Sequence, residues 1–364
     1  MIFEMRYVFS LFVLVIMSGL YSCTNKKASL PCGELEFHSL IQPAPLSAKF
    51  INDSMYIWGG SLIKSATDNK YHLFYSRWPR KLGMNGWVSH SEVVHAVSDS
   101  PCGPFVYKSV ALPVRGEKYW DGMMTHNPTI HYFNGKYYLY YTGNTGDGKS
   151  IINDLNWTHR NNQRIGVAVA DDPDGSWERL DYPVIDVSAD STAYDALMTS
   201  NPSITQMPDG HFLLIYKAVA RHRPLPFGGP VVHLAAIGSS PTGPFVKQAQ
   251  PVFTAEGSDF PAEDPYIWYD KDCYYAIVKD INGFFTDAGK SLVLFYSHNG
   301  LDWKLADEPL VTIRELIWED GTVQKLERLE RPQLYFEKGK PVVLLCAARE
   351  TLDHSFNVQI PLKH

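Results

Sequence analysis

The chain has 364 residues, 13% of them aromatic, and a formal net charge of −6. The mild negative charge argues against nucleic acid as a partner, because a nucleic-acid-binding face is basic. The length is enough for one large all-β domain or two ordinary domains.

The first residues predict export. Arg6 precedes an apolar run over residues 7–20, which is too short for a comfortable membrane span and is typical of a signal-peptide core. Leu20-Tyr21-Ser22-Cys23 resembles a bacterial lipoprotein box, so we expect lipidation of Cys23. An ordinary secretory signal and an uncleaved anchor are the alternatives.

These motifs predict three segments. Residues 1–22 are the signal peptide, residues 23–42 a tether and N-terminal segment, and residues 43–364 one catalytic domain. We expect an exported monomer that is held at the outer membrane, on its periplasmic or outer side, only through the lipid.

Four cysteines remain after Cys23, and none shows metal-ligand spacing. They are Cys32, Cys102, Cys273 and Cys346. An exported protein can pair them, but the sequence does not say which, and buried thiols are an equal alternative.

A sequence motif recurs five times along the domain. It consists of a short polar segment, usually ending in proline, followed by an apolar strand, a polar turn and an aromatic-rich second strand. Its anchor residues are Gly60, Pro128, Pro202, Pro265 and Pro332, at steps of 63 to 74 residues. A third strand and a Gly-containing turn follow in the first four copies. Because each period supplies three or four short strands, the sequence predicts an all-β, five-bladed β-propeller.

Three aspartates share one place in the repeat. Asp53, Asp121 and Asp195 each precede their anchor by seven residues. If the loops that lead into the inner strands converge on one mouth, these carboxylates meet there. The alternative is that each aspartate caps its own turn.

Further candidates lie where strands begin or end. Arg77 and Trp78 follow the second strand of the first repeat, His126 precedes the second anchor, and His222 lies in a basic loop, Arg221-His222-Arg223. An indole stacks on a sugar ring and a guanidinium donates to hydroxyls or a carboxylate, so we expect sugar contacts. Arg331 joins this set, and for each residue a structural role is the alternative.

Several carboxylates with aromatic and basic neighbours suit glycoside hydrolysis, which needs a proton donor and a second carboxylate. The chain resembles the five-bladed glycoside hydrolases of families 43, 62, 32, 68 and 117. In families 43 and 32 the general acid is a glutamate two residues before a blade-four proline, and Glu263 with Pro265 matches that spacing. The resemblance therefore implies that Glu263 is the general acid.

Two family positions differ. Asn201 stands where the acid-tuning aspartate is expected, and Gly59-Gly60 stands where the base is expected. Asp53 as base and Asp195 as tuner are the substitutes that we predict. Asp121, His126, Arg77, Trp78, His222 and Arg331 are the expected substrate contacts.

By family analogy we expect an exo-acting, inverting hydrolase of oligosaccharide or polysaccharide ends. No organic cofactor is implied; a structural calcium ion occurs in some relatives, and no ligand cluster in the sequence demands one. One alternative is a phosphorylase resembling family 130, with Arg221, His222, Arg223 and Arg331 as a phosphate clamp. The other is a non-catalytic glycan-binding propeller.

Overall fold

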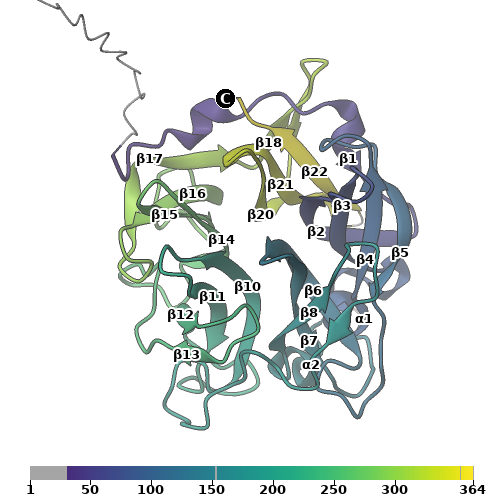
Figure 1. Ribbon diagram of the computed structural model, residues 1–364. Coiled ribbons are helices and arrows are strands. Elements are labelled where there is room, and N and C mark those ends of the chain that lie inside the picture. Colours follow the sequence, from purple (N-terminus) through teal and green to yellow (C-terminus); the bar gives the residue numbers. More distant parts are fainter. Residues whose placement is uncertain (1–30, 152–153, 353, 364) are drawn as a thin grey trace, which may run out of the picture. The chain divides into compact units, whose positions relative to one another are not determined.

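The computed structural model describes residues 31–151, 154–352 and 354–363. The predictions for the signal peptide and Cys23 lie outside these ranges. The unit Pro31–His364 contains five four-stranded sheets, and Figure 1 shows them arranged around a central axis. The predicted five-bladed β-propeller is confirmed.

Each blade runs antiparallel from an inner to an outer strand. The strands of blades one and two are β2 (Met55–Lys64), β3 (Tyr71–Pro79), β4 (Glu92–Ser98), β5 (Val106–Leu112), β6 (Met124–Phe133), β7 (Lys136–Asn144), β8 (Arg164–Ala170) and β9 (Glu178–Arg179). Those of blades three and four are β10 (Met198–Gln206), β11 (Phe212–Val219), β12 (Val231–Gly238), β13 (Phe245–Lys247), β14 (Ala262–Asp270), β15 (Cys273–Asp280), β16 (Ser291–Ser297) and β17 (Lys304–Ile313).

The last blade closes the ring with a strand from the start of the domain. Its own strands are β20 (Arg328–Glu337), β21 (Lys340–Thr351) and β22 (His354–Pro361), and β1 (Lys49–Phe50) pairs with β22 as the fourth. The two ends of the propeller are therefore joined by backbone hydrogen bonds, so the ring cannot open between its first and last blades without breaking them.

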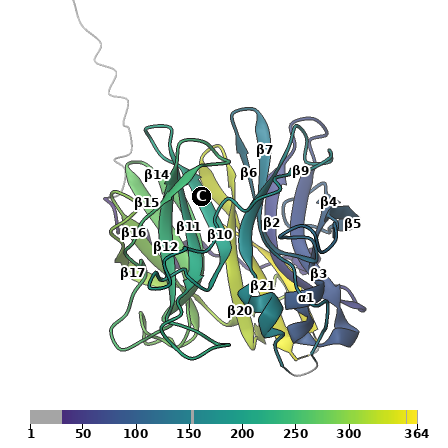
Figure 2. The same cartoon turned by 90° about the horizontal axis from the view of Figure 1, so that it is seen from below.

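The smaller elements lie between blades or cover their ends. They are β18 (Glu315–Ile317), β19 (Val323–Lys325), α1 (Trp87–His90), α2 (Trp157–Asn161) and the short 3-10 turns η1 (Phe37–Leu40), η2 (Leu46–Ala48), η3 (Arg80–Leu82) and η4 (Met84–Gly86). Figure 2 shows α1 near β3 at one end of the strands. Among the described residues, no helix is long and apolar enough to cross a membrane.

The hydrophobic core is divided among the contacts between neighbouring blades. Leu73 and Tyr75 of blade one pack with Leu345 of blade five, and Tyr140 of blade two packs with Leu214 of blade three. Because strands alternate sides, each sheet buries both faces against its neighbours. This explains the dense aromatic and aliphatic runs in every repeat.

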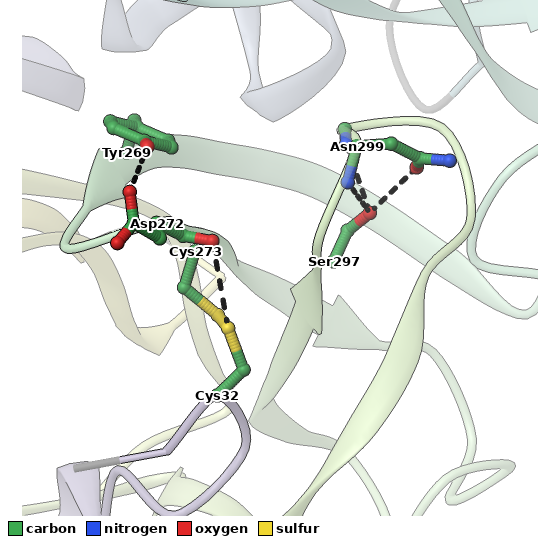
Figure 3. The surroundings of a disulfide bond; sticks show 7 residues. Cys32, Tyr269, Asp272, Cys273, Ser297 and Asn299 are labelled. Atoms are coloured by element: carbon green, nitrogen blue, oxygen red, sulfur yellow. Dashed lines mark hydrogen bonds between the residues drawn. A yellow bond between two sulfur atoms is a disulfide. The ribbon is translucent and has the colours of Figure 1, made fainter. Parts of the chain in front are cut away.

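Residues 31–42, which we assigned to the tether, pack against the propeller. Phe37 is fully buried beside Trp268, with ring centroids 6.3 Å apart. Figure 3 shows that Cys32 forms a disulfide with Cys273 at the start of β15. The pairing that the sequence left open is therefore Cys32–Cys273, while Cys102 and Cys346 are free thiols.

Every inner strand carries the same β-bulge. In each one the strand pairing shifts by one residue, and the residue before the anchor position has a left-handed backbone with φ between 51° and 57°. These residues are Gly59, Asn127, Asn201, Asp264 and Arg331. A bulge re-aims the flanking side chains and raises local twist, and proline is tolerated there because no ladder donor is needed.

We expect the double substitution Cys32→Ser/Cys273→Ser to lower the free energy of unfolding by about 2–5 kcal/mol, because the disulfide closes a very long loop. Urea denaturation without reductant measures this. Cys102→Ser removes a free thiol and should change stability much less. A double variant as stable as the parent protein would show that the disulfide does not hold the N-terminal segment.

Candidate active site

A pocket of about 100 Å³ opens where the inner strands begin. Four of its residues occupy one position of the repeat, directly before the left-handed residue of the bulge: Trp58, His126, Glu263 and Glu330. The bulge therefore explains why residues from four blades face one cavity. Trp78, Met84, Trp87, Asn127, Asn201, Lys217, Asp264 and Arg328 complete the lining.

Three acidic residues, Glu263, Asp264 and Glu330, form what we call the carboxylate cluster. Each offers an oxygen that lies within 4.8 Å of the other two. Lys217 Nζ donates to Glu263 Oε1 at 2.8 Å, and Lys279 Nζ lies 2.9 Å from Glu263 Oε2 and 2.8 Å from Glu330 Oε1. Buried carboxylates need such partners, because an unpaired charge is costly away from water.

The lysines come from strand positions next to the bulge. Lys279 lies directly across from Glu263 in the β14–β15 pairing, and Lys217 lies across from Ser200 in the β10–β11 pairing. Lys217 thus reaches from blade three to the glutamate of blade four. The ion pairs join neighbouring blades at the pocket.

The charge environment divides the cluster into two kinds of carboxyl group. Burial opposes ionisation of Glu263, but Lys217 and Lys279 outweigh it and hold the pKa of Glu263 well below its usual range. For Asp264, burial and then the negative charge of Glu263 raise the pKa to about 6, against the opposing effect of Arg331. Carboxyl groups with pKa values pushed apart are typical of acid and base pairs.

Below the pocket, the left-handed residues bond to one another around the central axis. Asn127 Nδ2 donates to Asn201 Oδ1 at 2.9 Å, and Asn201 Nδ2 donates to Asp264 Oδ1 at 2.6 Å. Arg331 closes the circle by donating to Asp264 Oδ1 at 3.4 Å and to the Asn127 carbonyl at 3.2 Å. Asp264 is thereby fixed in position through Oδ1.

This circle explains why blade one has Gly59 at the position where the family resemblance predicts an acid. A Cβ at Gly59 would lie 2.9 Å from Asn127 Oδ1 and 3.7 Å from Arg331 Nε. The space that an aspartate would need is therefore occupied. Glycine also adopts the left-handed backbone without strain.

Tryptophans form one side of the pocket, and we call Trp58, Trp78 and Trp87 the tryptophan wall. His126 stacks on Trp87 with centroids 4.7 Å apart, and its Nδ1 lies 2.7 Å from Ser91 Oγ. Burial and then the charges of Arg331 and Lys217 lower the pKa of His126 well below its usual value. The imidazole is therefore neutral at pH 7.

The structure brings some predicted residues to the pocket. Glu263, His126 and Trp78 line it. Arg331 lies just beneath as part of the circle, where it is 1% exposed and bonds to Asp264. A direct substrate contact by Arg331 is therefore not supported, because its guanidinium contacts Asp264 instead.

Asp121 and Asp195 do not reach this pocket. Each is buried and accepts a hydrogen bond from the tyrosine of its own second strand, Tyr141 and Tyr216. Each also forms an ion pair with a cation of its outermost strand, Arg179 on β9 and Lys247 on β13. The sequence motif that the two aspartates share thus marks a repeated structural contact, so the site roles predicted for Asp121 and Asp195 find no support here.

The remaining predicted residues also lie elsewhere. Asp53 is exposed, and its carbonyl accepts a hydrogen bond from Arg80. Arg77 forms an ion pair with Glu92 at 2.8 Å. His222 is exposed and lies 2.8 Å from the Thr192 carbonyl. None of the three lines the pocket, so the expected convergence of Asp53 with Glu263 does not occur.

Sequence reasoning missed several residues that shape the site, among them Trp58, Asp264, Glu330, Lys217 and Lys279. The repeat contained the signal: in four of the five copies, all but that of Ser200, the residue two before the anchor lines the pocket, as Glu263 does. Applying that offset to every copy would have identified Trp58 and Glu330.

Among the described residues, two groups have the spacing to hold a metal ion. The carboxylate cluster is one, but Lys217, Lys279 and Arg331 already balance its charge. The other is His72, His95 and Asp174, outside the pocket, with His72 Nδ1 2.9 Å from His95 Nε2. We assign no metal to the pocket.

If Glu263 raises the pKa of Asp264, then Glu263→Gln should lower it below 6. The loss of the negative charge and the two freed lysines act in the same direction. Carbon-13 NMR titration of the aspartate side chains measures this, with Asp264→Asn to assign the signal. Glu337→Gln, at the other end of β20, is the control and should leave that pKa unchanged; an equal pKa in the Glu263 variant would contradict the coupling.

Comparisons with known proteins bear on the fold and the kind of enzyme. A model of glycosyl hydrolases family 43 matches residues 106–201. No curated protein matches the chain.

Solved structures are similar over most of the chain at low identity. BT0996, solved as a complex with RGII, is 14% identical with a TM-score of 0.67 over 90% of this chain and 93% of that one. Zg3597, a family 117 glycoside hydrolase of the marine bacterium Zobellia galactanivorans, is 17% identical, with a TM-score of 0.62 and coverage of 90% and 91%.

CoXyl43, a family 43 β-xylosidase/α-arabinofuranosidase from a compost metagenome, is 15% identical with a TM-score of 0.56, over 89% of this chain and 96% of that one. At these identities the likeness shows the fold, and the matched family model adds the kind of enzyme. The chain is therefore a divergent, family 43-like glycoside hydrolase built on a five-bladed β-propeller.

Proposed function

We propose that the pocket hydrolyses glycosidic bonds of an oligosaccharide or polysaccharide, with the carboxylate cluster as its catalytic groups. One observation carries the proposal: three carboxyl groups meet within 4.8 Å in a cavity bounded by the tryptophan wall. Hydrolysis needs one carboxyl group to protonate the leaving oxygen and another to act at the anomeric carbon. Of the three indoles, Trp58 and Trp78 are buried, so the partly exposed Trp87 supplies the platform on which a sugar ring stacks.

The electrostatics suggest how the roles are divided. Glu263, held ionised between two lysines, is suited to attack the anomeric carbon. Asp264, with a pKa raised to about 6, keeps its proton to a higher pH than an ordinary aspartate and is protonated below about pH 6. Its Oδ1 takes the bonds from Asn201 and Arg331, so the proton sits on Oδ2. We therefore place the proton on Asp264, whereas family spacing predicts Glu263 as the acid.

The tight cluster also bears on the stereochemical course. Inverting enzymes separate their two carboxyl groups by roughly 6.5–9.5 Å to admit water, and retaining enzymes by about 5–5.5 Å. Oxygens within 4.8 Å favour the second arrangement. In that course Glu263 forms a glycosyl ester while Asp264 protonates the leaving oxygen, and Asp264 then deprotonates the water that cleaves the ester.

The pocket is small, at about 100 Å³, which suits one terminal sugar and supports exo-action. Two of the similar structures are described as complexes, one with RGII and one with xylotriose. We propose a substrate of the same general kind, a plant or algal glycan end.

Of the two other functions, the phosphate clamp predicted from Arg221, His222, Arg223 and Arg331 has no support. The first three side chains are exposed outside the pocket lining, and Arg331 is buried and paired with Asp264. The glycan-binding alternative has one observation in its favour: Lys217 and Lys279 neutralise Glu263. Turnover measurements separate it from hydrolysis.

We expect the parent protein to release sugar from a panel of plant and algal oligosaccharides without phosphate. Glu263→Gln should reduce kcat/KM by about 10²-fold or more, because an amide cannot act as base or nucleophile. Glu337→Gln should retain activity. Binding without turnover across the panel would favour a glycan-binding protein, and a strict need for phosphate would indicate phosphorolysis.

We expect Asp264→Asn to lose about 10²-fold or more of its activity on phenyl glycosides but far less on dinitrophenyl glycosides, because a good leaving group needs no proton. In the parent protein kcat/KM should fall as pH rises through about 6, since the acid must be protonated. If Glu263→Gln, and not Asp264→Asn, keeps its activity on dinitrophenyl glycosides, then Glu263 is the general acid and the two roles are exchanged.

A further inference from the structure

A second cavity of about 180 Å³ adjoins the catalytic pocket, and we call it the cationic pocket. Five basic residues line it against two carboxylates: Lys279, Lys290, Arg314, Arg328 and Arg349, with Glu327 and Glu330. Arg328 and Glu330 line both cavities. A ligand that fills one cavity therefore contacts residues of the other.

The two carboxylates do not balance the five cations. Glu330 is shared between Lys279 at 2.8 Å and Arg328 at 3.5 Å, and Glu327 pairs with Arg349 at 3.0 Å. Lys290 and Arg314 have no carboxylate partner within residues 31–151, 154–352 and 354–363; Arg314 donates instead to the Glu327 carbonyl at 3.0 Å. The cationic pocket therefore keeps a net positive charge.

Two of the arginines repel each other across the sheet. Arg328 and Arg349 lie directly opposite in the β20–β21 pairing, an arrangement that destabilises a sheet when the charges are alike. Burial and then the charge of Arg328 lower the pKa of Arg349. Arg349 Nε is also buried without a hydrogen-bond partner among the described residues. An anion between them would relieve this repulsion.

We propose that the cationic pocket is an oxyanion subsite, which holds the carboxylate or sulfate group of an acidic sugar next to the sugar bound at the carboxylate cluster. The proposal rests on the proposed function, because it names the class of substrate for the same site. Guanidinium groups present paired N–H donors that match a planar carboxylate or a sulfate. An ammonium group such as Lys290 adds charge without fixed geometry.

The catalytic pocket itself is a poor place for the anion. Its lysines are already paired with Glu263 and Glu330, so a sugar anion there would have to displace a carboxylate from Lys217 or Lys279. Because the cations come from blades four and five and line the cavity that shares Glu330 with the catalytic pocket, the anion is drawn into that cavity and fixes the direction in which the glycan enters. The subsite would therefore select both charge and orientation.

The test is direct binding, measured by calorimetry or ligand-observed NMR at low salt. The probes are galacturonic acid, glucuronic acid and galactose 6-sulfate, each compared with its neutral sugar, and inorganic phosphate alone. The parent protein should bind at least one acidic probe about tenfold or more tightly than its neutral counterpart. Added salt should reduce that preference.

Lys290→Gln/Arg314→Gln should abolish the preference. The matched control is Lys304→Gln/Lys340→Gln, which removes two exposed cations at the opposite ends of their strands and should keep it. Thermal melts confirm that both variants fold. Equal binding of acidic and neutral probes, or a preference that survives in the first variant, would overturn the subsite.

The different probes also identify which anionic group the subsite binds. A response to the uronic acids identifies a carboxylate and a response to the sulfated sugar identifies a sulfate. Binding of inorganic phosphate as tight as that of the acidic sugars, with phosphate-dependent turnover, would overturn the acidic-sugar assignment. A preference for acidic probes without any hydrolysis would contradict the proposed function but support the subsite. Hydrolysis of neutral glycans, with no preference for acidic probes, would support the proposed function but contradict the subsite.

Discussion

The left-handed bulge in each inner strand is the constraint on which this protein depends. It places one residue of each of four blades, Trp58, His126, Glu263 and Glu330, in the pocket and the following residue in the circle below. The hydrogen bonds of that circle fix Asp264, and its crowding excludes a side chain at Gly59. Fold and site are therefore built by one repeated backbone feature, so a change in it would disturb both.

Charge compensation is the second organising principle. Three carboxyl groups gather in a largely buried place, where unpaired charges are costly, and Lys217, Lys279 and Arg331 offset them. The compensation is uneven: Glu263 receives two ammonium groups, while Asp264 receives a more distant guanidinium. This unevenness, and not residue type, separates their pKa values and hence the roles that we propose. The surplus of cations in the cationic pocket, which blades four and five contribute, then extends the same logic to a substrate.

Asp121 and Asp195 show why a strong sequence pattern can mislead. Their sequence motifs match because, in both blades, the aspartate connects the segment before the inner strand to Tyr141 or Tyr216 and to the outermost strand. Such buried anchors recur with the same spacing as catalytic residues would, because both follow the blade geometry. Only their partners, which come from strands far along the chain, tell the two cases apart.

The sequence by itself determined the all-β class and the number of blades, because hydrophobic alternation and turn chemistry are local and repeat five times. It did not determine the N-terminal strand β1 in blade five or the Cys32–Cys273 pair, since both join segments from distant parts of the chain. Of the residues predicted for the site, Glu263, Trp78 and His126 line the pocket, and their roles stay predictions. Tertiary structure decided which residues surround Glu263, because ion pairs between blades depend on distances that no spacing along one strand encodes.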